Sequence, residues 1–275
     1  MKRNLRISAV IPAYNEDDVI YWTIRNLVNQ NIYVHVLDNE STDSTSRIVK
    51  EFPKSQVSLS SFDTNGQFNE KVQGENIQAI LHKLEAKSDW LLKNDADEFL
   101  ESPFQNMSAR EGIDLADKLG FNCVGSRNFT FFPMSEEVHH VSKDDVRKHY
   151  DYYKIWDQVD RWTPEFHTQY NELWKINVFK CRAGIFYIDP HKVSPLTNIV
   201  LFPHLFIIRH YPFRHPERTK NRLLKERRYR MSSWNIENRV SCHYSQYTED
   251  DTFVFDEKRQ EMRRWSEFRK PIFQA

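Results

Sequence analysis

Short apolar runs alternate with helical patterns through the first part of the chain, and this alternation restricts the fold more than any other feature. The apolar runs lie at residues 7–11, 33–37, 56–60 and 90–92, and each predicts a strand. Apolar side chains recur at helical spacing in residues 19–28, 48–52 and 77–84, which lie between those runs. Such alternation with short connections predicts a parallel sheet with right-handed crossovers. We therefore expect an α/β fold with a Rossmann-like, mostly parallel sheet flanked by helices.

After residue 104 this pattern becomes looser. Residues 113–119 predict a helix, and residues 121–132, 173–188 and 200–211 predict extended segments. Between them, residues 148–174 are crowded with Tyr and Trp, which suits either a binding surface or a satellite aromatic core. The sequence leaves both interpretations open.

Charge and cysteine content restrict the partners and the compartment. The 39 basic and 39 acidic side chains cancel, so we expect no nucleic-acid partner, and any charged ligand must meet a local patch. Three widely separated cysteines, Cys123, Cys181 and Cys242, predict buried thiols in a reducing compartment. No stretch approaches the ~18 apolar residues that span a bilayer. These features predict a cytoplasmic protein.

One basic segment leaves a peripheral membrane contact open. Residues 214–230 contain eight Lys or Arg and two Glu, with apolar side chains at roughly helical spacing. A solvated helix face is the ordinary interpretation of such a run, and contact with phosphate or lipid headgroups at the inner face of a membrane is the alternative.

The segment WLLKNDADEF is an apolar run that ends abruptly at Asp95 and Asp97. Open α/β sheets bind ligands at the carboxyl ends of their strands, and Glu16 and Asp38 follow two other predicted strands. Two carboxylates there suit Mg²⁺ or Mn²⁺, which prefer oxygen ligands completed by phosphates and water. A solvated acidic turn is the alternative for an isolated pair. The convergence of three acidic strand ends favours a nucleotide with a metal-bound diphosphate.

Several common nucleotide and hydrolase motifs are missing. The turn after the first predicted strand is PAYNE, without the glycines of a dinucleotide fingerprint. Neither a P-loop nor a G-x-S-x-G elbow occurs. The sequence therefore disfavours a dinucleotide-dependent enzyme, a P-loop kinase and an α/β-hydrolase.

The segments SAVIPAYNE, VLDNESTD and NDADEF, in this order and spacing, resemble the family 2 glycosyltransferases with the GT-A fold. HYPFRHPE, at residues 210–217, resembles a carboxyl-terminal element of a bacterial subgroup. The resemblance implies a GT-A domain with a nucleotide-sugar-binding half at residues 1–104. Residues 105–275 would form the acceptor-side half with C-terminal helices, within the same compact unit.

The resemblance also implies an activity. Such an enzyme would be a metal-dependent, hexosyltransferase-like glycosyltransferase that uses Mn²⁺ or Mg²⁺ and a UDP- or GDP-linked sugar donor. The acceptor would be a hydroxyl of a saccharide or of a lipid-linked molecule, in surface-polysaccharide or glycolipid biosynthesis, with an inverting outcome.

The resemblance places several residues at the donor. It implies that the nucleotide is lined by Pro12, Tyr14, Asn15 and Glu16, that Asp38 and Asn39 reach the base or ribose, and that Asp95 and Asp97 border the diphosphate. Asp95 and Asp97 would be metal ligands, with Asp97 favoured as the direct one. His210 would join them because a neutral imidazole binds Mn²⁺ well beside carboxylates, and a strand-end histidine bonded to the backbone is the alternative. Arg209 and Arg214 flank His210, and either would suit phosphate oxygens. Asn39 and Glu40 stand where the family commonly has Asp and Gly, so the nucleobase contact stays open.

The catalytic base has no clear motif. An inverting transfer needs a carboxylate that takes the acceptor proton. Asp189 and His191, in YIDPHKV, are the first candidates, with Glu172 and Asp157 behind them, and a structural role is open for each. Trp156, Trp162 and Trp174 would suit the apolar face of an acceptor sugar, or ordinary packing.

Two other functions stay open. A nucleotide-sugar hydrolase or a nucleotidyltransferase would use the same metal site. A non-catalytic binding protein with the same fold would keep the donor pocket and lack turnover.

Overall fold

The computed structural model describes residues 4–138, 144–155, 175–189 and 192–274. Its first half alternates strands and helices as predicted. The strands are β1 (Ile7–Ala13), β2 (Tyr33–Asp38), β3 (Val57–Ser61) and β4 (Trp90–Lys93), and the helices are α1 (Ile20–Val28), α2 (Thr45–Val49) and α3 (Glu70–Glu85). The four strands are parallel neighbours in the order β3-β2-β1-β4.

The second half extends the same sheet with strands of mixed direction. It contains β5 (Glu98–Glu101), β6 (Cys123–Phe131), β7 (Tyr152–Ile155), β8 (Lys175–Lys180), β11 (Leu201–His210) and β12 (Arg263–Arg264). β8 joins β4 to β6 with antiparallel pairing on both sides, and β11 lies parallel to β6 and antiparallel to β5. The predicted α/β class with helices flanking the sheet is confirmed.

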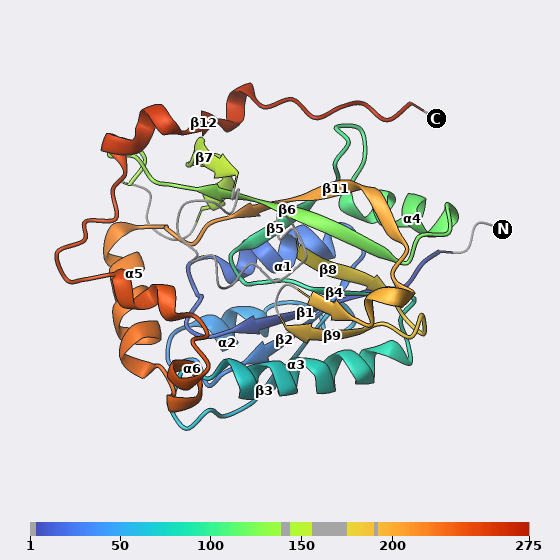
Figure 1. The fold of residues 1–275 in the computed structure, drawn as a ribbon, viewed down its shortest axis with the longest axis horizontal. Helices are drawn as coiled ribbons and strands as arrows, with labels where there is room; N and C mark the ends of the chain where they lie inside the picture. The colour runs from blue at the N-terminus through green and yellow to red at the C-terminus, as the bar shows by residue number, and fades with distance from the viewer. Residues whose placement is uncertain (1–3, 139–143, 156–174, 190–191, 275) are drawn as a thin grey trace.

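Helices and short segments complete the second half. α4 (Ala109–Lys118) begins at a capping box in which Ser108 and Glu111 exchange hydrogen bonds. β9 (Phe186–Asp189) and β10 (Lys192–Ser194) form a small separate sheet, and α5 (Pro216–Lys220) and α6 (Ser233–Glu237) follow β11. Figure 1 shows α5 and α6 at the end of the sheet towards which β1 runs.

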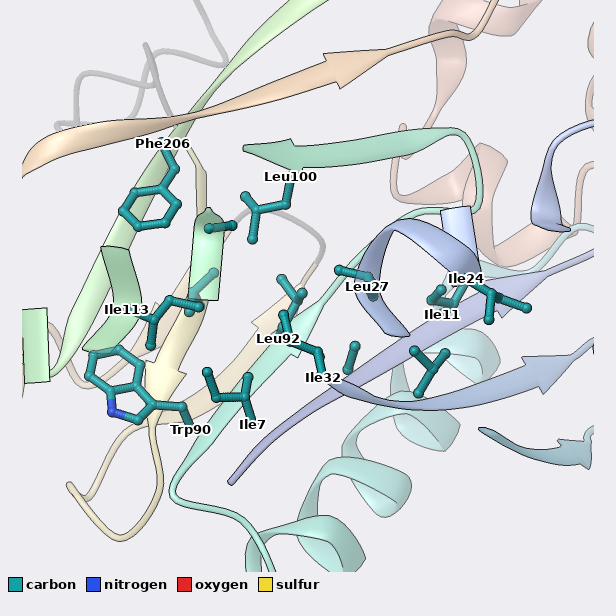
Figure 2. Close-up of a cluster of buried hydrophobic side chains, with 14 of the residues drawn as sticks. Ile7, Ile11, Ile24, Leu27, Ile32, Trp90, Leu92, Leu100, Ile113 and Phe206 are labelled. Carbon is teal, nitrogen blue, oxygen red and sulfur yellow. The ribbon is translucent and has the colours of Figure 1, made fainter. Parts of the chain in front are cut away.

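One hydrophobic core joins the two halves (Figure 2). Ile24 and Leu27 of α1 and Ile113 of α4 belong to the same buried cluster as Phe206 of β11. Trp90 lies fully buried in this cluster, and its indole N–H donates to Asp117 at 2.9 Å. The carboxyl ends of the strands are therefore held by packing that spans residues on both sides of residue 104.

Three local predictions need correction. The first strand was expected to end before Pro12, yet β1 continues to Ala13. The pairing of β1 with β4 ends at Val10, so the N–H that Pro12 lacks removes no hydrogen bond between these two strands. Cys123 and Cys181 are buried free thiols, whereas Cys242 is exposed. The short strand β5 was not expected within the DADEF segment.

No helix among the described residues is long and apolar enough to cross a membrane.

Candidate active site at the carboxyl ends of the strands

The loop after β1 is tied to the loop after β2 by Asn15. Asn15 has a φ of 52°, in the left-handed region that Asn tolerates better than most residues. Its side-chain oxygen accepts hydrogen bonds from the backbone N–H groups of Thr42 (2.8 Å) and Asp43 (3.3 Å). The Glu16 N–H donates to the Thr45 hydroxyl at 2.8 Å. These bonds hold Glu16 at the carboxyl end of the sheet.

Asp38 and Asn39 lie beside this loop because Asp38 pairs with Ala13 in the β1–β2 register. Asp38 accepts hydrogen bonds from the hydroxyls of Ser41 (2.5 Å) and Ser46 (2.9 Å), so its carboxylate orders the following loop. A base or ribose that contacts Asp38, as predicted, would therefore have to compete with the Ser41 and Ser46 hydroxyls for its carboxylate oxygens. Asn39 remains at the surface of a pocket.

That pocket, the donor pocket, is lined by Pro12, Tyr14 and Asn39 on one side and by Glu226, Arg227 and Arg230 on the other. The guanidinium of Arg230 lies 3.9 Å from the centre of the Tyr14 ring. The free volume is about 20 Å³, little more than one water molecule needs. The C-terminal segment thus covers the place where the sequence predicts the nucleotide.

A buried cluster of charges, the acid–arginine cluster, lies next to this pocket. Arg214 donates to Glu16 at 2.7 Å and to Asp18 at 2.6 Å, and Arg222 donates to Asp97 at 2.9 Å. Glu16 and Asp97 are each only 3 % exposed. Burial by itself raises the pKa of Glu16, but Arg214 and Arg222 outweigh it and lower the pKa to about 2. Glu16 is therefore ionised, and the carboxylates of the cluster are paired with arginines from the C-terminal segment.

Asp95 lies in a separate ionic group. Its carboxylate contacts Lys93 on one oxygen, and the other lies 3.5 Å from the ammonium of Lys175. Lys175 also donates to both oxygens of Glu98, at 2.6 and 2.7 Å. Burial raises the pKa of Asp95, but Lys93 and Lys175 outweigh it and hold this pKa well below its usual range. Both oxygens of Asp95 are thus engaged by lysines, although a third of its side chain is exposed.

His210 is brought beside Asp97 by strand pairing. His210 pairs with Glu98 across β11 and β5, and the N–H of Tyr211 donates to the carbonyl of Asp97 at 3.0 Å. The Nε2 atom of His210 lies 3.7 Å from Oδ1 of Asp97, on the carboxylate oxygen that the arginines leave open. The sequence placed these two residues together as metal ligands, and the fold does bring them together.

Asp97 and His210 are the candidate ligands for a divalent cation. Within the described ranges, no group of three or more His, Cys, Asp and Glu side chains gathers for a metal. Asp97 Oδ1 and His210 Nε2 provide two ligands, and Mg²⁺ or Mn²⁺ commonly takes one or two protein ligands with substrate phosphates and water. The residues therefore fit a cation whose coordination is completed by a diphosphate. Asp95 is less suited, because it is occupied by two lysines.

Other predicted residues lie elsewhere or outside the described residues. Arg209 turns away from the cluster, because its guanidinium lies 3.6 Å from Glu101 and stacks over the Phe131 and Trp265 rings. The backbone of Asp189 lies in β9, and its side chain is not described. The remaining candidates for the base and for acceptor stacking lie outside the described residues: Asp157, Glu172, His191, Trp156, Trp162 and Trp174.

The basic segment at residues 214–230 is only partly a solvated face. Arg214 and Arg222 are buried and point into the acid–arginine cluster, whereas Lys225 and Tyr229 are exposed. Residues Asn221–Arg227 form a π-helix, a form that often occurs at functional sites. Two of the eight cations are therefore not available to a lipid headgroup.

Sequence reasoning missed Asp18, Lys93, Glu98, Lys175 and Arg222 as members of the site. Lys93 and Glu98 flank the DAD segment, so the segment itself carried a signal for them. Nothing in the sequence distinguishes Arg222 from the other Lys and Arg residues of the basic segment at residues 214–230. Lys175 is 77 positions from Glu98, and no local pattern connects the two.

The comparisons with known proteins agree with this architecture. A family model described as Glycosyl transferase family 2 matches residues 8–183. The match does not reach residues 210–217, whose resemblance to a bacterial subgroup stays a prediction. No curated protein matches the chain.

Solved structures show a more distant likeness. TarS 1–349 from S. aureus in complex with UDP is 17 % identical over 51 % of this chain and 38 % of that chain, with a TM-score of 0.33. Glucosyl-3-phosphoglycerate synthase from Mycobacterium tuberculosis, in complex with Mn²⁺, UDP and glucosyl-3-phosphoglycerate, is 20 % identical over 46 % of this chain and 44 % of that chain, with a TM-score of 0.30. The chain thus spans about two fifths of each of these structures, and values this low support no argument about substrate.

Proposed function

Because the chain belongs to glycosyl transferase family 2, whose model matches more than half of it, we propose that it transfers a sugar from a nucleotide-sugar donor to a hydroxyl acceptor. The observation that carries the proposal is the meeting of Glu16, Asp97 and His210 beside the donor pocket. Glu16 and Asp97 follow β1 and β4, and His210 is the last residue of β11; the three strands run in the same direction, so their ends share one edge of the sheet. Ligands bind at such an edge in open α/β sheets.

The donor is a UDP- or GDP-linked sugar in this proposal. Tyr14 and Asn39 would contact the base or ribose from the wall of the donor pocket. Asp97 Oδ1 and His210 Nε2 would hold Mn²⁺ or Mg²⁺, with diphosphate oxygens completing the coordination. When bound, the cation would offset the charge that develops on the leaving diphosphate. Arg214, the sequence candidate for phosphate contact, is paired with Glu16 and Asp18, so those ion pairs would have to open before it could donate charge-assisted hydrogen bonds to phosphate oxygens.

The acceptor is a saccharide or a lipid-linked molecule, and the outcome is inverting. Asp189 would take the proton from the acceptor hydroxyl while the sugar carbon is attacked opposite the leaving group, with His191 and Glu172 as the other candidates. The pathway would be surface-polysaccharide or glycolipid biosynthesis. A cytoplasmic location with contact between residues 214–230 and a membrane is part of the same proposal, supported by the exposed Lys225 and Tyr229.

Calorimetry with Mn²⁺ and either UDP or GDP tests the donor site. The wild-type chain should bind one nucleotide more tightly with Mn²⁺ than with EDTA, and His210→Ala and Asp97→Asn should lose that difference. Asp250→Asn, at an exposed acid outside the site, is the matched control and should keep it. Thermal melts identify a variant that fails to fold. Equal metal dependence in His210→Ala and the wild type would remove the ligand assignment.

A donor panel scored by nucleoside diphosphate release then tests turnover. Release that requires an added saccharide or lipid-linked acceptor supports transfer, whereas free sugar released without an acceptor indicates a hydrolase. One observation favours a non-catalytic binding protein as the second candidate: the acids are already neutralised by arginines and lysines, and the donor pocket is nearly filled. Nucleotide binding without release by any donor would support that candidate.

A further inference from the structure

The structure contains a second cleft, the α1 cleft, beside helix α1. It has a volume of about 550 Å³ and is lined by one face of α1, the end of β5, the start of α4, the residues around Arg147 and the C-terminal tail at Lys270. Binding sites for small ligands commonly enclose ~300–1,000 Å³. None of its lining residues belongs to the donor pocket, so the two are separate sites.

The lining of the α1 cleft is strongly cationic. It contains Arg25, Arg147, Lys148 and Lys270, against the single carboxylate of Glu101. The whole chain has a net charge of zero, so this excess is a local property. Arg25 and Lys148 are exposed and have no acidic partner among the residues described here. Arg147 pairs with Asp145 and Lys270 pairs with Glu101, so the positive charge that remains for a ligand is that of Arg25 and Lys148, and it favours an anion.

Three of these cations are held in position by other side chains. Arg147 donates to both oxygens of Asp145, at 2.9 and 2.7 Å, and to Asn26 at 2.8 Å. Arg25 donates to the Tyr21 hydroxyl at 2.7 Å, and Lys270 donates to Glu101 at 2.5 Å. Binding to cations that are already fixed loses less side-chain conformational entropy than binding to mobile ones. The cleft is thus built before a ligand arrives.

The rest of the lining suits a sugar. Asn29 and Gln30 present amide groups that can exchange hydrogen bonds with hydroxyls, and Trp22 presents an aromatic ring that can pack against a sugar's C–H face. Arginine and lysine bind phosphate through charge-assisted hydrogen bonds. We propose that the α1 cleft binds a phosphate-bearing saccharide. This goes beyond the proposed function, because it concerns a second site.

β5 and α1 both run from the neighbourhood of the acid–arginine cluster to the α1 cleft. β5 begins at Glu98, next to Asp97, and reaches the cleft at Glu101, roughly 10 Å farther along the strand. α1 begins two residues after Asp18, which pairs with Arg214, and continues along the cleft. A saccharide held in the α1 cleft would therefore lie near the donor site.

Calorimetry with glucose 6-phosphate and glucose tests the proposal on the full chain. Glucose 6-phosphate should bind, and glucose should bind at least about tenfold more weakly, because glucose cannot form the charge-assisted hydrogen bonds that the phosphate accepts. Arg25→Gln combined with Lys148→Gln should lower the affinity for glucose 6-phosphate at least about tenfold. Arg47→Gln combined with Lys118→Gln removes two exposed cations outside the cleft and should leave the affinity unchanged.

Two further measurements distinguish a phosphorylated sugar from a lipid headgroup as the ligand, and the α1 cleft from the donor site. Vesicles of equal parts phosphatidylcholine and phosphatidic acid test for a lipid source of the phosphate, and binding of vesicles without binding of glucose 6-phosphate would overturn the proposal. Absence of glucose 6-phosphate binding, or equal binding by the Arg25→Gln, Lys148→Gln variant, would also overturn it. UDP binding with Mn²⁺ should be the same in this variant and the wild type, so a failed donor site and a failed α1 cleft give different results.

Discussion

The Nη2 atom of Arg222 lies 2.9 Å from Oδ2 of Asp97, and both side chains are buried. Asp97 follows β4, whereas Arg222 belongs to the π-helix of the C-terminal segment. The pair therefore joins the segment that covers the donor pocket to the acid that is the best candidate for a metal ligand. Ordering of the C-terminal segment and the charge of the site are physically coupled through this contact.

Removing the cation of this pair should destabilise the fold. Arg222→Met leaves the buried carboxylate of Asp97 with less compensation, so we expect a loss of ~3–5 kcal/mol in the free energy of unfolding. Urea unfolding measures this loss. Arg47→Met, at an arginine whose side chain is 69 % exposed and pairs with Glu51, is the control and should change stability by under about 1 kcal/mol. Equal effects of the two variants would show that the Arg222 contact contributes little.

Lys175→Met should be far more damaging than Lys180→Met, although both lysines lie in β8. Lys175 is 3 % exposed and bonds both oxygens of buried Glu98, so its loss should cost ~3–5 kcal/mol. Lys180 is 39 % exposed and pairs with Asp117 at 2.8 Å, which predicts a loss under about 1 kcal/mol. Urea unfolding of the two variants gives the comparison. A small loss in Lys175→Met would show that the buried Lys175–Glu98 contact contributes little to stability.

Stability should fall in acid through Glu16. Its pKa is lowered from 4.5 to about 2 in the folded state, since the arginines outweigh the effect of burial. The contribution is therefore fully present above about pH 4.5 and is lost as the pH falls towards 2. Melting temperatures of the wild type and of Glu16→Gln, measured from pH 5 to pH 2.5, should converge as the pH falls. Parallel curves would place the acid sensitivity in other groups.

Two glycine-to-alanine variants should have opposite effects. A Cβ at Gly112, in α4, would lie 2.6 Å from the Phe206 ring in the core, so Gly112→Ala should cost ~1–3 kcal/mol through overpacking. A Cβ at Gly74, in α3, would meet nothing within 4 Å, so Gly74→Ala should stabilise the chain by ~0.5–1 kcal/mol. Chemical denaturation measures both. A neutral Gly112→Ala would indicate that the Phe206 ring moves aside easily.

Hydrophobic periodicity was sufficient to predict the α/β class and most elements of the first half. Residues 7–11, 33–37 and 90–92 became β1, β2 and β4 with small changes at their ends. This worked because buried parallel strands are continuous apolar runs and amphipathic helices repeat every 3.6 residues, and both are local properties. β5 was not predicted because it has only four residues, too few to show a periodic pattern, and it directly follows a turn.

The positions of Glu16, Asp97 and His210 near one edge of the sheet could be anticipated, because each lies at or after the end of an apolar run. The carboxyl ends of parallel strands lie at the same edge of a sheet. The partners of these side chains could not be anticipated. Arg222 contacts Asp97 across 125 positions, and Lys175 contacts Glu98 across 77, so no window of sequence contains both members of either pair. Local side-chain periodicity thus determined which segments become strands and helices. Only the packing of β8 and the C-terminal segment against the strand ends decided which charges meet, because ion pairing depends on distance in space.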